Sequence, residues 1–109
     1  MAAPVTVPVE VTPDATARIE ELGMRREFEK MIEYTKKAVD DLQSIDVTVY
    51  DDPYEPGEPR MVIRAWREGC GTVDDPSRSS WVDWYVKTFA PDVRRWFSFE
   101  IDYGTNHGR

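Results

Sequence analysis

The feature that most constrains this chain is a dense block of aromatic residues between Trp81 and Tyr103. Eight of the thirteen aromatic residues lie in it: Trp81, Trp84, Tyr85, Phe89, Trp96, Phe97, Phe99 and Tyr103. The first half of the block repeats at helical spacing, and the second half alternates as a strand does. Aromatic side chains bury large areas, so the block predicts a core or an interface. It contains no recognisable reaction motif.

The N-terminal third of the chain predicts a helix with a break. Thr12-Pro13-Asp14 is typical of a helix start, because Thr12 can cap the helix and Pro13 suits its first position. An apolar stripe then continues at helical spacing to about Gln43. Gly23 is a poor helix former, so we expect a break there between a short helix and a long one.

Alternating apolar residues predict three strands, at 46–50, 60–67 and 95–103. The proline-rich loop 51–59 is short, so the first two strands should form an antiparallel hairpin. The segment 77–89 follows a typical helix start and ends before Ala-Pro, which favours a helix. Its Trp, Val, Tyr and Thr residues also suit a strand.

These elements predict an α+β fold. We expect an antiparallel sheet of three to four strands, with one long N-terminal helix and a second, shorter helix packed on one face. If 77–89 is a strand instead, a single helix is wrapped by a four-stranded antiparallel meander. That alternative resembles a cystatin-type or nuclear-transport-factor-type roll. The resemblance is one of element order only, so it implies nothing about activity.

The sequence predicts one domain, at 12–104, followed by a flexible tail at 105–109. Residues 1–11 form an N-terminal arm or an edge strand, because valines alternate there and two prolines remove backbone donors. Such an arm could pair with its own sheet or cross to a neighbouring subunit.

Composition bounds the partners of the chain. Its formal net charge is −7, which disfavours nucleic acid and anionic membrane surfaces. No apolar run is long enough to span a bilayer, and the first ten residues do not resemble a signal peptide. One cysteine cannot form an internal disulfide, so we expect a cytoplasmic protein.

Candidate chemistry is sparse. Cys70 lies in a loop between two glycines, and the one histidine, His107, lies near the C-terminus, so a catalytic pair is not expected. The acidic loops lack the spacing of known calcium sites. We therefore predict no metal site, no cofactor and no catalytic residue. An alternative is a carboxylate-dependent enzyme that uses Asp83, Glu100 or Asp102.

The best functional clue is a second sheet face that the helices should leave uncovered. Strand alternation places aromatic and charged side chains on it, and these are the predicted interface residues: Tyr50, Val62, Arg64, Trp66, Trp96 and Glu100. We expect this face to be too apolar to remain in water. It predicts a protein-protein interaction or regulatory module that forms a homodimer through the aromatic face. A binder of small ligands with an aromatic-lined pocket is the alternative.

Overall fold

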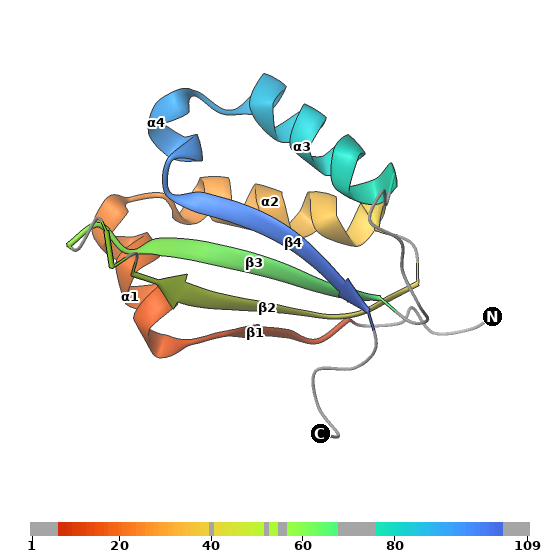
Figure 1. The fold of residues 1–109 in the computed structure, drawn as a ribbon, viewed down its shortest axis with the longest axis horizontal. Helices are drawn as coiled ribbons and strands as arrows, with labels where there is room; N and C mark the ends of the chain where they lie inside the picture. Colours follow the sequence, from red (N-terminus) through yellow and green to blue (C-terminus); the bar gives the residue numbers. More distant parts are fainter. Residues whose placement is uncertain (1–6, 40, 52, 55–56, 68–75, 104–109) are drawn as a thin grey trace.

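The computed structural model describes residues 7–39, 41–51, 53–54, 57–67 and 76–103. Four strands and four helices follow along these parts of the chain (Figure 1). In order they are β1 (Val9–Val11), α1 (Pro13–Leu22), α2 (Arg25–Ala38), β2 (Leu42–Tyr50), β3 (Arg60–Arg67), α3 (Pro76–Thr88), α4 (Pro91–Arg94) and β4 (Phe97–Tyr103). The predicted α+β class is confirmed.

The strands form one mixed sheet in the order β1-β2-β3-β4. β2 and β3 pair antiparallel, as predicted for the hairpin. The other two pairs, β1 with β2 and β3 with β4, are parallel. The prediction of an antiparallel sheet is therefore wrong. Two helices separate the strands of each parallel pair, and they return the chain to the end of the sheet where the first strand began.

The predicted break in the N-terminal helical segment is confirmed at Gly23. This residue ends α1 in the left-handed region, with φ 68°. Its N–H donates to the carbonyl of Glu20, and the N–H of Met24 donates to the carbonyl of Ile19, both at 3.1 Å. This pattern satisfies the last carbonyls of α1 and lets α2 start in a new direction.

The predicted end of the second helix, at about Gln43, is wrong. α2 ends at Ala38, where Val39 turns extended, and β2 begins at Leu42 rather than at 46. Asp41 makes the turn with a φ of 56°, a conformation that Asp tolerates better than most residues. Val39 is buried in the core from its extended position after α2, so its apolar spacing did not mark a helix face.

The segment 77–89 is helical, since α3 spans Pro76–Thr88, so the meander alternative is wrong. A short helix that was not predicted, α4, follows α3. β4 consequently begins at Phe97 instead of 95. The predicted alternation is confirmed at the start of β4, where Phe97 and Phe99 are buried on the inner side and Ser98 and Glu100 are exposed.

One core lies between the helices and the inner face of the sheet. Trp81 of α3 is fully buried at its centre and stacks on Phe99, with ring centroids 4.2 Å apart. The Trp81 indole N–H donates to Oγ1 of the buried Thr35 at 2.9 Å, which links α3 to α2. The aromatic block therefore supplies much of the core.

The predicted N-terminal arm contributes β1 at one edge of the sheet. Residues 1–6 of that arm and the predicted tail at 105–109 lie outside the described residues. Within the described ranges, no helix has the length and apolar character needed to cross a membrane.

Candidate functional site

The helices leave one side of the sheet uncovered within the described part of the chain, and we call this side the open face. In Figure 1 it is turned toward the viewer, with α1 and α2 behind it. Strand alternation assigns to it the even-numbered side chains of the four strands, except Leu42, which precedes a register shift in β2 and packs against the core. These side chains are Glu10, Ser44, Asp46, Thr48, Tyr50, Arg60, Val62, Arg64, Trp66, Ser98, Glu100 and Asp102.

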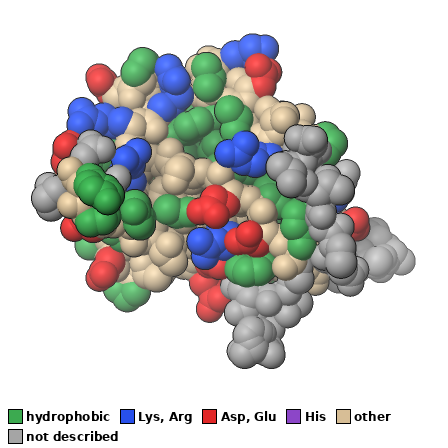
Figure 2. Space-filling model, viewed as in Figure 1, with side chains coloured by type: hydrophobic (Ala, Val, Ile, Leu, Met, Phe, Trp, Pro, Cys, Tyr) green, Lys and Arg blue, Asp and Glu red, His purple; other side chains and the backbone are tan. Residues whose placement is uncertain are grey.

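Arg64 lies at the centre of the open face among three carboxylates. The strand register places it between Asp46 of β2 and Glu100 of β4. Its guanidinium nitrogens lie 2.9 Å from Asp102, 3.7 Å from Glu100 and 3.9 Å from Asp46. We call these four residues the Arg64 cluster. In Figure 2, acidic and basic side chains lie next to one another over the middle of the sheet.

Trp66 joins this cluster through its indole. The indole N–H donates to Oδ2 of Asp46 at 2.7 Å, so the polar edge of the ring is paired. Asp46 therefore contacts both Trp66 and Arg64, and its side chain is only 17% exposed. These contacts hold an aromatic ring and a guanidinium side by side on neighbouring positions of one strand face.

Trp96 lies apart from the Arg64 cluster, just before β4. The guanidinium groups of Arg18 and Arg95 each lie 4.8 Å from its ring centroid. Arg95 also binds Glu58 at 2.6 Å, and these residues border a hollow of about 150 Å³ with Arg60. Trp96 thus packs between two cations at one end of the sheet.

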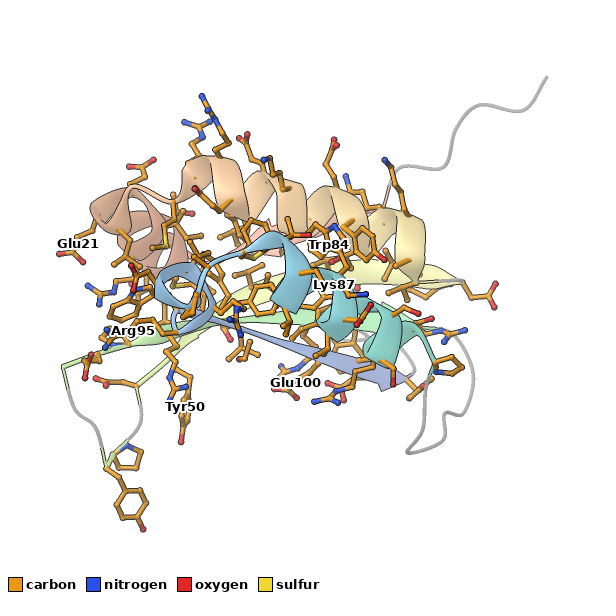
Figure 3. The ribbon with its side chains drawn as sticks, turned by 90° about the horizontal axis from the view of Figure 1, so that it is seen from above. Glu21, Tyr50, Trp84, Lys87, Arg95 and Glu100 are labelled. Carbon is orange, nitrogen blue, oxygen red and sulfur yellow. The ribbon has the colours of Figure 1, made fainter. Side chains whose placement is uncertain are left out.

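The predicted interface residues therefore fall into two groups. Arg64, Trp66 and Glu100 come together in or beside the Arg64 cluster. Tyr50 is 51% exposed and lies, with Arg95, at the other end of the molecule, as Figure 3 shows. Val62 lies between the two groups, half-buried in the middle strand β3.

Two residues of the cluster, Asp46 and Asp102, were absent from the predicted interface. Strand alternation already placed Asp102 with Glu100, but Asp46 was treated only as the start of a strand. The hairpin register would have found it, because Asp46 pairs directly with Arg64. With these carboxylates present, the open face is less apolar than the sequence suggested.

Of the three carboxylates of the enzyme alternative, Glu100 and Asp102 come together and Asp83 does not. Asp83 lies on α3 and binds Lys87 at 3.0 Å, whereas Glu100 and Asp102 both contact Arg64 on the open face. Among the described residues, no group of three His, Cys, Asp or Glu side chains could hold a metal ion. Cys70 and His107 lie outside those residues.

Burial raises the pKa of the Tyr85 hydroxyl well above its usual range, and nearby Arg94 opposes this shift. The hydroxyl lies 2.9 Å from the carbonyl of Phe97 and 3.1 Å from that of Arg94, and these two acceptors share its single proton. Because it is protonated and buried away from the open face, it acts as a structural donor.

The open face carries both charged and aromatic side chains. It is a broad surface with fixed charges and aromatic rings, and its carboxylates are held by a guanidinium. Comparison with protein-family models, with curated proteins and with solved structures finds no significant match to this chain.

Proposed function

We propose that this chain is a protein-interaction module that binds a basic segment of a partner protein on its open face. The observation that supports this most directly is the Arg64 cluster with the Trp66 indole beside it. Tryptophan, tyrosine and arginine are the residues on which protein interfaces most often depend. A sheet surface without helices offers them to a partner.

The side chains of this surface are held in place before any partner arrives. Arg64 forms an ion pair with Asp102 at 2.9 Å, and the Trp66 indole donates a hydrogen bond to Asp46 at 2.7 Å. A surface that is ordered in advance loses less side-chain entropy on binding. This favours a role in recognition over a role in chain stability, because partly exposed ion pairs stabilise a fold only weakly.

The charge of the open face favours a basic partner over a second copy of the chain. The face carries four carboxylates, of Glu10 and of the Arg64 cluster, against the guanidinium groups of Arg60 and Arg64, which gives a formal charge of −2. Two such faces would repel each other. Lysine or arginine side chains of a partner would be attracted instead.

The other functions that the sequence allowed stay predictions. Self-association through the aromatic face would have to overcome the charge repulsion between two copies. For a small-ligand site, the hollow beside Trp96 offers one aromatic ring and a volume of about 150 Å³. Neither has an observation in its favour as specific as the Arg64 cluster.

The test is capture of the partner from the native source by the wild-type chain and by two open-face variants, Trp66→Ala and Glu100→Lys. A partner identified by mass spectrometry should carry a basic segment. Its affinity should fall at least about tenfold with Trp66→Ala, as for a central aromatic anchor. Glu100→Lys should also weaken binding, and the loss of affinity should be larger in low salt than in high salt.

Two variants away from the open face serve as controls. Tyr54→Ala removes an aromatic ring that is 91% exposed in the loop between β2 and β3. Glu21→Lys makes the same charge change as Glu100→Lys, but on α1. Both should leave binding unchanged. Equal binding by all variants, or no captured partner at all, would contradict the proposed function.

A further inference from the structure

A groove runs between α2 and the edge strand β1, on the helix-covered side of the sheet. It has a volume of about 580 Å³, and we call it the β1 groove. Its apolar residues are Val9, Phe28 and Ile32, and its charged residues are Arg26, Glu29, Lys30, Glu33 and Lys36. A second hollow of about 240 Å³ continues it past Val11 and Phe28.

The backbone of β1 offers unused hydrogen-bonding groups along this groove. The carbonyl of Pro8 accepts from Ile45, and the N–H of Thr12 donates to Val47, so even-numbered residues of β1 face β2. The N–H and C=O groups of Val9 and Val11 therefore point to the outer edge, because successive residues of a strand alternate in direction. No strand of the described chain pairs with that edge.

β1 is short, with three residues, which is one protection of an edge strand, but no proline, lysine or inward-pointing charge blocks its outer side. Natural sheets block their edges with proline, lysine or an inward-pointing charge. Pro8 does not block this edge, since its missing N–H would face β2, and the side chains that point inward are Val9 and Val11. At the opposite edge, pairing of two β4 strands would bring Glu100 and Asp102 of both copies together, so that edge is disfavoured.

We propose that two copies of the chain join edge to edge, with β1 antiparallel to β1, to form one continuous eight-stranded sheet. With the two-fold axis at Val9, the outward N–H and C=O groups of the two Val9 residues form hydrogen bonds with each other. In this register Glu10 lies opposite Pro8 of the partner subunit, so the two Glu10 carboxylates do not meet. The two α2 helices then lie antiparallel over the junction and cover the half-buried Phe28.

The charges of α2 complement a second copy in this arrangement. The β1 groove is lined by residues from Arg26 to Lys36 around Val9, so an axis through Val9 passes near the middle of α2. An axis between Glu29 and Lys30 places Arg26 opposite Glu33 of the partner subunit. It also places Glu29 opposite Lys30 of the partner subunit. Opposite charges therefore meet at each of these positions.

This association is independent of the proposed partner binding. It uses the β1 edge and the helix side of the sheet, so both open faces remain uncovered. They would become neighbours on one side of the joined sheet. A partner with two basic segments could then bind both faces at once, with a gain in avidity over one face alone.

The test is the solution mass of the full chain by light scattering across a concentration series. The wild type should reach twice its chain mass of 12.6 kDa. Val9→Pro should dissociate the dimer, because it removes an outward N–H that no strand of the same chain uses. Circular dichroism would check that the variant still folds.

A charge exchange on the exposed side of α2 tests the same interface without touching β1. Arg26→Glu should weaken dimerisation at least about tenfold, because it faces Glu33 of the partner subunit. The double variant Arg26→Glu with Glu33→Lys should restore it. Lys37→Glu makes the same charge change outside the groove and should have no effect.

A wild-type chain that stays monomeric at the highest concentration would overturn this inference. So would a dimer that persists in both Val9→Pro and Arg26→Glu, since its interface would lie elsewhere. Such a result would not contradict partner binding by the open face. Conversely, failure to capture a partner would not contradict the dimer.

Discussion

Among the described residues, Tyr85 has the pKa that folding shifts most clearly. Its hydroxyl is buried between α3 and β4 and donates to backbone carbonyls, and burial raises its pKa. Folding therefore favours the protonated form. Below about pH 10, the usual tyrosine pKa, both folded and unfolded chains keep the proton and no stability is lost. Above it, the unfolded chain releases a proton that the folded chain retains, so stability falls.

Tyr85→Phe should remove this loss of stability at alkaline pH. At neutral pH the variant should be less stable by about 1 kcal/mol, because a buried hydrogen bond is missing. Between pH 10 and 12 the difference should shrink, since phenylalanine has no proton to release. Urea denaturation at several pH values measures this, and a constant difference would contradict it. Exposed Tyr50→Phe is the matched control and should behave like the wild type.

At the scale of elements, the junction between α1 and α2 depends on Gly23. A Cβ added there would meet no atom within 4 Å, so only its backbone conformation, with φ 68°, resists substitution. Gly23→Ala should cost about 1 kcal/mol, and Gly23→Asn should cost less because Asn tolerates the left-handed region. Thermal or urea denaturation would check this order. An alanine variant as stable as the wild type would contradict it.

Local signals in the sequence were enough for most elements. The helix start at Thr12, the break at Gly23 and the strand from Arg60 to Arg67 all depend on residues close together in the chain. The end of α2 was missed because Val39 fits both a helical stripe and a buried turn. α4 was missed because four residues after a proline carry little periodicity.

Of the strand pairings, only the β2–β3 hairpin could be predicted from its short loop, and the two parallel pairings could not. Alternation assigned Arg64, Trp66 and Glu100 to one side of their strands, but it gave no neighbour in the sheet. Asp46 and Asp102 approach Arg64 from two other strands, and one of those strands lies parallel to β3. The Arg64 cluster is therefore a product of topology, which the sequence pattern did not contain.

At the scale of the whole molecule, the fold consists of two similar halves. Each half is a strand, two helices and a second strand parallel to the first, and the β2–β3 hairpin joins the halves antiparallel. As a result β1 and β4 lie at opposite edges of the sheet and run in opposite directions. The start of β1 and the end of β4 lie at the same end of the sheet (Figure 1).

This arrangement has a mechanical consequence. A force that pulls Val7 away from Tyr103 acts across the strands and opens the sheet from one end, so the hydrogen bonds break one after another. A force between Val7 and Tyr50, the far end of β2, acts along two parallel strands and loads all their hydrogen bonds together. Single-molecule pulling should therefore find a lower rupture force for the first pair of attachment points, and equal forces would contradict this. The molecule is expected to be weak in one direction and strong in the other.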